Sequence, residues 1–266
     1  MTDLTMNDGR SIPAIGFGTY RVPPAQAEAN TRAAVAAGYR LVDTAAFYAN
    51  EAGTAAAVAG HDVFLTTKLW RDGMGYDAAL RGFDASMAQM GRESVDLYLI
   101  HWPMPSQDLY VETWKAFVRL REEGRAKSIG VSNFEPGHIR RIADATGVLP
   151  AVNQVELHPA FQQRHLREYH VENGIIVQSW APLGVGRLLS APAVMSAAER
   201  HNATPAQAIL AWHRQHGLAS IPKSSSPARL AENLASLDLE LDAEAMAAID
   251  ALDDPEGRTG PDPSTL

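Results

Sequence analysis

The segment VDLYLIHW (residues 95–102) is followed by YVETWKAFVRLREEG (110–124) and KSIGVSN (127–133), and this succession indicates the fold. The first and third pieces are short apolar runs, which are typical of strands buried on both faces of a parallel sheet. The middle piece carries apolar residues at helical spacing and ends at Gly124, a residue type that commonly terminates helices. Together they predict one strand–helix–strand unit.

The same alternation extends over most of the chain. A second helix is predicted from Pro24 to Gly38. Eight apolar runs recur between such segments: AIGFGT (14–19), YRLVDTA (39–45), VFLTTKL (63–69), VDLYLIHW, KSIGVSN, AVNQVEL (151–157), IIVQSWAP (175–182) and ASIPKS (219–224). Eight strands that alternate with helices predict a (β/α)8 TIM barrel.

Both ends of the chain differ from this pattern. LTMNDGRSIP (4–13) reads as an N-terminal β-hairpin, because Asn7-Asp8-Gly9 supplies residues that tolerate a positive φ at a turn. DDPEGRTGPDPSTL (253–266) is rich in Pro and Gly and should form an irregular C-terminal tail. No linker interrupts the 266 residues, so we expect residues 1–266 to form a single domain.

Composition excludes several functions. The chain has no cysteine, which removes disulfides, thiolate catalysis and sulfur-based zinc sites. A net charge of −8 argues against non-specific binding to nucleic acid. There is no apolar run of about 20 residues, and the N-terminus lacks the basic start and apolar stretch of a signal peptide. We therefore expect a monomeric cytoplasmic protein with no membrane span, no metal and a small-molecule substrate.

Polar groups gather where the apolar runs end. In a barrel of this type the active site lies at the C-terminal ends of the strands, so these groups should converge on one mouth. In chain order they are Asp43 with Tyr48, Lys68, His101, Ser132 with Asn133, Gln154, Trp180, and Lys223 with Ser224. A single Asp or His of this kind is often only a cap or a satisfied core residue, but the whole set favours catalysis.

Four of these groups predict a proton donor. Lys68 is one of only four lysines among 23 basic residues, so its chemistry is expected to matter. Its ammonium should lower the pKa of the Tyr48 phenol, and Asp43 should hold the buried ammonium charged. His101 is expected to direct an N–H toward the carbonyl oxygen of a substrate.

Eight motifs resemble, in order and spacing, those of the aldo-keto reductase family: GFGTY, VDTAAFYANE, TTKLW, LYLIHWP, IGVSNF, NQVELHP, QSWAPLG and IPKSSSPARLAEN. The match covers nearly the whole chain. Within the family, the chain looks most similar to the bacterial 2,5-diketo-D-gluconate reductase group. The resemblance implies NADPH-dependent reduction of aldehydes, ketones or dicarbonyls to alcohols. Asp43, Tyr48, Lys68 and His101 would be the catalytic tetrad, with Tyr48 as the proton donor.

The resemblance also implies a binding site for NADPH. Gly18, Thr19 and Asp43 would lie beside the nicotinamide, Ser132, Asn133 and Gln154 would bind its carboxamide, and Trp180 would stack on the ring. The backbone of Leu183, Gly184 and Gly186 would follow the pyrophosphate. Lys223, Ser224 and Arg229 would bind the 2′-phosphate, with Glu232 and Asn233 at the adenine. The Gly16-Phe17-Gly18 run is not a Rossmann fingerprint, because Arg21 replaces the third Gly.

The substrate pocket implied by the same motifs is aromatic, formed by Tyr20, Tyr48, Trp70, His101 and Trp102. Three other functions stay open. A lysine at a barrel strand end also suits a Schiff-base aldolase through Lys68. A metal hydrolase would use Asp43, His101, Glu156 and His158. The third alternative is a regulatory module that binds nicotinamide nucleotides without turnover.

Overall fold

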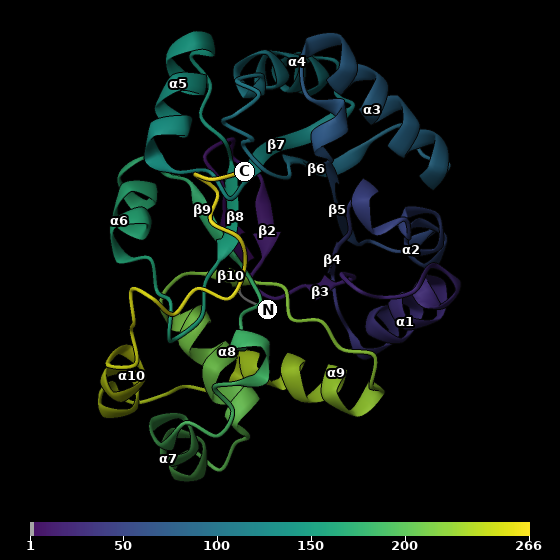
Figure 1. Ribbon diagram of the computed structural model, residues 1–266. Helices are drawn as coiled ribbons and strands as arrows, with labels where there is room; N and C mark the ends of the chain where they lie inside the picture. The colour runs from purple at the N-terminus through teal and green to yellow at the C-terminus, as the bar shows by residue number, and fades with distance from the viewer. Residues whose placement is uncertain (1–2) are drawn as a thin grey trace.

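The computed structural model describes residues 3–266 and contains an eight-stranded parallel sheet curled into a barrel (Figure 1). The strands are β3 (Phe17–Gly18), β4 (Leu41–Asp43), β5 (Phe64–Leu69), β6 (Val95–Ile100), β7 (Ala126–Ser132), β8 (Val152–Glu156), β9 (Ile176–Trp180) and β10 (Ala219–Ser220). They pair in sequence order. The expected barrel is confirmed.

The first and last strands close the barrel. Ile15 forms a parallel bridge with Ser220, and the Gly16 N–H donates to the Ser220 carbonyl at 2.8 Å. Further along, the Gly18 N–H donates to the Pro222 carbonyl at 3.2 Å. A Cβ on Gly18 would come within 2.8 Å of the Ile221 carbonyl oxygen. Gly18 is therefore required by the closure of the barrel itself.

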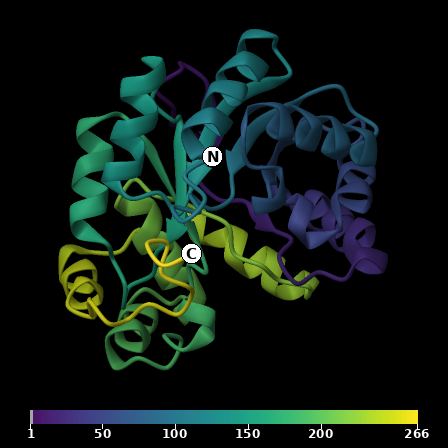
Figure 2. The ribbon, with the colours of Figure 1, turned by 45° about the horizontal axis from the view of Figure 1, so that its top comes forward.

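Helices surround the strands in both ribbon views (Figures 1 and 2). Five of them begin with a proline, which suits the first helical turn because that turn needs no backbone N–H there. The α-helices are α1 (Pro24–Ala37), α2 (Glu51–Val58), α3 (Tyr76–Met90), α4 (Tyr110–Glu122), α5 (Pro136–Thr146), α6 (Arg164–Glu172), α7 (Pro192–Arg200), α8 (Pro205–Gln215), α9 (Pro227–Leu234) and α10 (Ala243–Asp250). Short 3-10 turns are η1 (Ala46–Tyr48), η2 (Arg71–Gly73), η3 (Gly184–Gly186) and η4 (Ala235–Asp238).

The N-terminal hairpin closes the bottom of the barrel. It consists of β1 (Asp3–Thr5) and β2 (Ser11–Pro13), paired antiparallel around Gly9, whose φ is 83°. Met6 and Ile12 from this hairpin are buried in a cluster with barrel residues such as Leu41, Leu97 and Leu99. The expected hairpin is confirmed, and the opposite end of the strands is left for a site.

The chain beyond α10 forms neither helix nor strand, as expected. In Figure 1 this C-terminal tail returns from α10 across the sheet and ends beside β8 and β9. Its end is held by Ser106, whose hydroxyl donates to the Leu266 carbonyl at 3.1 Å. Within residues 3–266 no helix is long and apolar enough to cross a membrane.

Candidate active site

A buried ion pair lies at the C-terminal ends of β4 and β5. The Lys68 ammonium donates to Asp43 Oδ1 at 2.5 Å and to the Thr44 carbonyl at 2.9 Å. Both charged side chains are almost fully buried. Burial lowers the pKa of Lys68 and raises the pKa of Asp43, while the attraction between the two groups opposes both shifts. The attraction between the two groups therefore offsets only part of the effect of their burial.

Tyr48 lies near this pair because it is the last residue of the 3-10 turn η1, which is followed by Ala49 with a φ of 54°. The side chain of Asn50 braces the turn, accepting from Thr44 Oγ1 at 2.6 Å and donating to the Thr19 carbonyl at 3.0 Å. The Lys68 ammonium lies 3.5 Å from the Tyr48 hydroxyl. Asp43, Lys68 and Tyr48 therefore meet, and Asn50 is a supporting residue that sequence reasoning missed.

The predicted lowering of the Tyr48 pKa is wrong for this structure. Burial, followed by the negative charge of Asp43 and by Tyr20, raises the pKa of Tyr48 well above 10. The reason is geometric, because Lys68 is committed to Asp43 at 2.5 Å and reaches the phenol only at the limit of a hydrogen bond. Tyr48 is consequently a fully protonated phenol at neutral pH.

His101 follows β6 and faces Tyr48, with 5.7 Å between the ring centroids. Burial, and secondarily the positive charge of Lys68, lowers the pKa of His101 well below 6.5. Its Nδ1 atom is buried and has no hydrogen-bond partner in the described part of the chain. The imidazole is thus neutral at pH 7, and Nε2 is the nitrogen that can reach a ligand.

Three polar side chains at the ends of β7 and β8 form a connected network. Ser132 Oγ donates to the Gln154 carbonyl at 2.7 Å, and Asn133 Nδ2 donates to the His101 carbonyl at 3.0 Å. Gln154 Nε2 donates to Asp43 Oδ2 at 2.7 Å and to Gln178 Oε1 at 2.6 Å. Gln154 is therefore tied directly to the ion pair, and this link was not predicted from the sequence.

Trp180 ends β9 and is half-buried beside this network. Its indole N–H donates to Asn133 Oδ1 at 2.8 Å. Asn133 has a φ of 63°, a left-handed conformation that asparagine tolerates better than most residues. The indole plane is therefore fixed relative to the Ser132, Asn133 and Gln154 group.

Aromatic side chains border the mouth next to Tyr48. The ring centroids of Tyr20 and Tyr48 are 5.2 Å apart, and those of Trp70 and His101 are 5.1 Å apart. Phe47 stacks on Trp70 at 4.0 Å and is 52% exposed, a wall residue that the sequence analysis did not identify. Trp102 is half-buried and packs against the main core cluster.

The segment before and within α9 is more open. Lys223 is exposed and donates to Ser225 Oγ at 2.9 Å, and Arg229 is exposed without an ion pair within residues 3–266. Ser224 is buried, and its hydroxyl accepts from the Ser226 N–H at 3.2 Å. Glu232 is half-buried on the same helix. Asn233 is instead buried beside Tyr39, whose hydroxyl donates to the Leu230 carbonyl at 3.2 Å.

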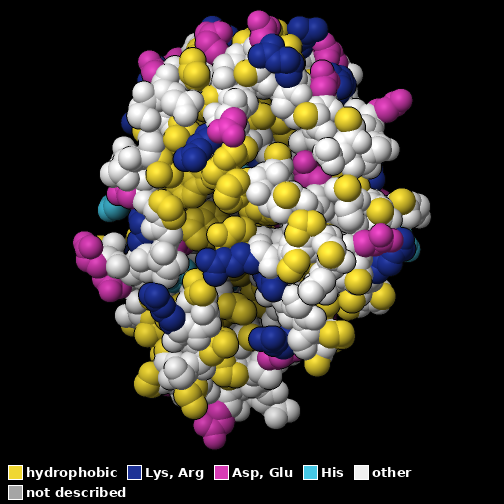
Figure 3. Space-filling view, turned by 45° about the vertical axis from the view of Figure 1, so that its right-hand side comes forward, with side chains coloured by type: hydrophobic (Ala, Val, Ile, Leu, Met, Phe, Trp, Pro, Cys, Tyr) yellow, Lys and Arg dark blue, Asp and Glu magenta, His cyan; other side chains and the backbone are white. Residues whose placement is uncertain are grey.

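The loop after β9 contains the 3-10 turn η3. Leu183 is half-buried, while Gly184 and Gly186 adopt positive φ values of 56° and 83°. Val185 between them has a φ of 55°, a strained value for a β-branched residue. Figure 3 shows one face of the molecule with a hollow lined by hydrophobic side chains and Lys and Arg side chains gathered below it.

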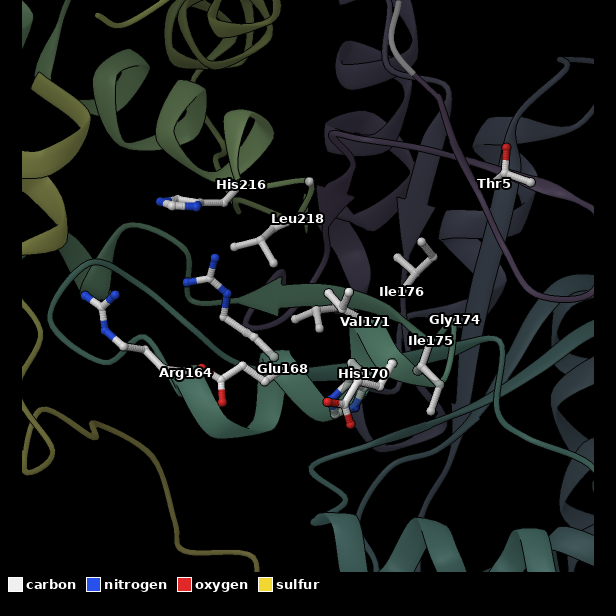
Figure 4. A pocket seen from close by; sticks show the side chains of 14 residues that line it. Thr5, Arg164, Glu168, His170, Val171, Gly174, Ile175, Ile176, His216 and Leu218 are labelled. Atoms are coloured by element: carbon white, nitrogen blue, oxygen red, sulfur yellow. The ribbon is translucent and has the colours of Figure 1, made fainter. Parts of the chain in front are cut away.

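A separate cavity of about 570 Å³ lies at the other end of the barrel, between α6, the start of β9 and the loop before β10 (Figure 4). Arg164, His170, Val171, His216 and Leu218 are among its lining residues. Because it adjoins the N-terminal ends of the strands, it is remote from Asp43 and Lys68.

The metal-hydrolase set does not come together as a ligand group. Asp43 is occupied by Lys68 and Gln154, and Glu156 is occupied by donors from Thr259 and Gly260. In residues 3–266 no three His, Asp or Glu side chains are arranged to hold a metal ion.

A lysine–carboxylate pair, a phenol and a neutral imidazole at the mouth of a parallel barrel are an arrangement suited to acid–base chemistry. A sequence model of the aldo/keto reductase family matches residues 14–254. The chain therefore belongs to the aldo/keto reductase family of oxidoreductases, and the resemblance seen in its eight motifs is confirmed.

Individual relatives are similar over almost their full length. The chain is 52% identical to an aldo-keto reductase from Mycobacterium sp. (strain KMS), over 99% of this chain and 97% of the relative. It is 42% identical to the methylglyoxal reductase DkgA from Yersinia pestis, over 99% and 96%. A crystal structure of a Gox0644 mutant in complex with NADPH matches with a TM-score of 0.98 at 52% identity, covering 100% of this chain and 98% of that one.

Proposed function

We propose that this protein is an NADPH-dependent reductase that converts aldehydes, ketones or dicarbonyls into alcohols, with Tyr48 as the proton donor. The observation that carries the proposal is the buried Asp43–Lys68 pair beside a protonated phenol and a neutral imidazole. This arrangement supplies a proton and a hydrogen bond to one oxygen atom. A carbonyl oxygen that becomes an alkoxide requires both.

Each residue of the proposed tetrad has a separate role in the reduction of the carbonyl group. His101 Nε2–H orients the carbonyl oxygen between its own ring and Tyr48. Tyr48 transfers its proton to that oxygen as negative charge develops there, because an alkoxide is a stronger base than a phenolate. The Lys68 ammonium, 3.5 Å away, stabilises the phenolate that remains, and Asp43 keeps the ammonium charged.

NADPH, when bound, supplies the hydride that reaches the carbonyl carbon. The donor set at the mouth fits its nicotinamide: Trp180 offers a fixed aromatic face, and Gln154 uses its amide N–H groups on Asp43 and Gln178, so its carbonyl oxygen can accept from a carboxamide. Ser132 and Asn133 border the same place, and Thr19 is joined to Asp43 by a bond from its N–H to the Asp43 carbonyl at 2.9 Å. The structure of the Gox0644 mutant with NADPH, a relative at 52% identity, supports this choice of cofactor.

Recognition of the phosphates is assigned to the more open parts of the site. Lys223, Ser224 and Arg229 would bind the 2′-phosphate through charge-assisted bonds, with Glu232 and Asn233 beside the adenine. Asn233 would contact the adenine through its backbone, or through its side chain after a change of rotamer, because the side chain now contacts Tyr39. The Leu183, Gly184 and Gly186 backbone would follow the pyrophosphate.

The substrate class follows from the walls around Tyr48. Tyr20, Phe47 and Trp70 present exposed or partly exposed rings, so small carbonyl compounds with a flat or apolar substituent are favoured. The methylglyoxal reductase DkgA at 42% identity adds small dicarbonyls to this set. We also infer that the chain acts as a single domain, since one barrel contains every residue of the proposed site.

A direct assay tests the proposal. Purified protein is mixed with NADPH and, separately, with methylglyoxal, benzaldehyde and a keto-sugar, and the loss of NADPH absorbance is followed. We expect turnover with at least one aldehyde or dicarbonyl, and the alcohol as the product. Borohydride trapping of a carbonyl on Lys68 would instead support the aldolase alternative, and NADPH binding without turnover would support the regulatory one.

A further inference from the structure

Glu156 is a buried carboxylate at the mouth that the proposed reaction does not use. It ends β8 and is 1% exposed. Oε1 accepts from the Thr259 N–H at 2.6 Å and from Thr259 Oγ1 at 2.5 Å, and Oε2 accepts from the Gly260 N–H at 2.9 Å. His158 Nε2 lies 3.3 Å from Oε1. Burial would raise the pKa of Glu156, but the hydrogen bonds from His158, Thr259 and Gly260 outweigh burial and lower it.

These contacts bring the tail against Trp180. Glu156 and Trp180 are register partners on the adjacent strands β8 and β9, so the carboxylate lies beside the indole. A Cβ on Gly260 would come within 2.5 Å of Trp180 Cη2 and 3.1 Å of Glu156 Oε2. The tail backbone therefore touches the benzo edge of the indole, and only glycine fits at this contact.

The indole is thus held at two edges. Its pyrrole N–H is bonded to Asn133, and its benzo edge rests on Gly260. The base of the tail has an anchor of its own, because Asp253 accepts from the Gln162 N–H at 2.9 Å and pairs with Arg164 at 2.8 Å. Loss of the Glu156 bonds would therefore free the Thr259–Gly260 segment without detaching the whole tail.

We propose that Glu156 is a positioning residue for the cofactor: its carboxylate clamps Thr259 and Gly260 so that the tail fixes the Trp180 indole on which the nicotinamide stacks. This proposal rests on the proposed function, because it assigns Trp180 to the nicotinamide. Glu156 touches neither the substrate nor the reacting atoms. Its effect should appear in the binding of NADPH rather than in the proton transfer from Tyr48.

The first test is Glu156→Gln, which preserves the volume but directs an NH₂ group at backbone N–H donors. We expect the dissociation constant for NADPH, measured by fluorescence titration, to rise on the order of tenfold. The turnover number at saturating NADPH should stay within a few-fold of wild type. The matched control is Ser106→Ala, which releases the end of the tail at Leu266 and should bind NADPH as wild type does.

A second readout needs no cofactor. The emission of Trp180 is obtained as the difference between a protein with Trp180 and the same protein with Trp180→Phe. Glu156→Gln should shift and broaden this emission, because the freed indole becomes more exposed. Gly260→Ala should do the same from the tail side, and it leaves the carboxylate intact if Glu156→Gln fails to fold.

The outcomes separate the two proposals. If wild-type protein turns over carbonyls with NADPH, but Glu156→Gln and Gly260→Ala match Ser106→Ala in NADPH affinity and Trp180 emission, the clamp is refuted and the reductase function stands. If the wild-type protein has no NADPH turnover, the proposed function fails. In that case a Trp180 emission shift shared by both variants would support only the tail contact, and the assignment to cofactor binding would be overturned.

Discussion

Two regions of the mouth use the same kinds of side chain in opposite ways. At the ends of β4, β5 and β6, Asp43, Lys68 and His101 are buried. The two charges are paired with each other, and Asp43 also accepts a hydrogen bond from Gln154. Before and within α9, Lys223 and Arg229 are exposed and are not held by any carboxylate of the described chain. In the first region the ion pair and hydrogen bonds are already formed without a ligand. In the second region the cations can still move to contact one.

The difference matches the roles proposed for the two regions, which are catalysis for the buried groups and cofactor binding for the exposed cations. Buried polar groups that satisfy one another keep their positions and cannot be removed singly without leaving an unpaired partner. Exposed cations keep their hydration and gain a partner only when an anion arrives. Substitutions should therefore be severe at the first region and graded at the second, and the following predictions test this contrast.

The largest effect is expected for Tyr48→Phe. The ring and its contacts with Tyr20 and His101 remain, so NADPH should still bind, while turnover should fall by about 10²- to 10⁴-fold because the general acid is lost. Steady-state kinetics with saturating NADPH measures the change. Tyr98→Phe is the control, since Tyr98 is a fully buried tyrosine whose hydroxyl has no partner in residues 3–266. Near wild-type turnover by Tyr48→Phe would overturn the mechanism.

Next in size is the effect of Lys68→Met on stability. Removing the ammonium leaves the Asp43 carboxylate buried and unpaired, which should lower the free energy of unfolding by about 3 to 5 kcal/mol. Denaturant titration measures this loss, and the double variant with Asp43→Asn should recover part of it. The control Lys127→Met breaks the partly exposed pair with Asp96 and should cost about 1 kcal/mol or less. Equal losses of unfolding free energy in Lys68→Met and Lys127→Met would contradict the contrast between buried and exposed charges.

Arg229→Ala probes the exposed region and should have a smaller, selective effect. A charge-assisted contact with the 2′-phosphate contributes about 1.5 to 3 kcal/mol, so the KM for NADPH should rise about tenfold or more. The KM for NADH, which lacks that phosphate, should hardly change. Arg32→Ala on α1 is the control. The same loss with both cofactors would refute a phosphate role for Arg229.

The smallest effect is expected from pH, because kcat/KM for aldehyde reduction should hardly change across the neutral and alkaline range. Reduction needs protonated Tyr48 and neutral His101, and it would fail as pH rises past the Tyr48 pKa or falls past the His101 pKa. The Tyr48 pKa lies well above 10 and the His101 pKa well below 6.5, so kcat/KM for aldehyde reduction should be constant between pH 6.5 and 10. A decline between pH 7 and 9 would show that Lys68 lowers the phenol pKa after all.

The sequence alone predicted the barrel and the convergence of the tetrad well. Both depend on local signals, namely apolar runs such as VDLYLIHW and polar residues placed where those runs end. Once the strands are parallel and consecutive, their ends must meet at one edge. Asp43 and Lys68 therefore came together without any knowledge of the contacts around them.

Features that depend on distant packing were not predicted. Glu156 and Thr259 lie 103 residues apart, and nothing in the tail sequence indicates which strand it reaches. The predicted direction of the Tyr48 pKa was wrong because this pKa depends on how far Lys68, held by Asp43, lies from the phenol and on the burial around it. The inward side chain of Asn233 and the stacking of Phe47 on Trp70 likewise require the packed helices and loops.

The bridge between Ile15 and Ser220 has a consequence for how the protein is made. The first barrel strand has its second neighbour only after about four-fifths of the chain has left the ribosome, so one edge of the growing sheet stays unpaired throughout synthesis. Exposed strand edges invite association with other chains. Expression of chains truncated before Ala219 should therefore yield aggregates, because the strand β10 that covers this edge is then missing.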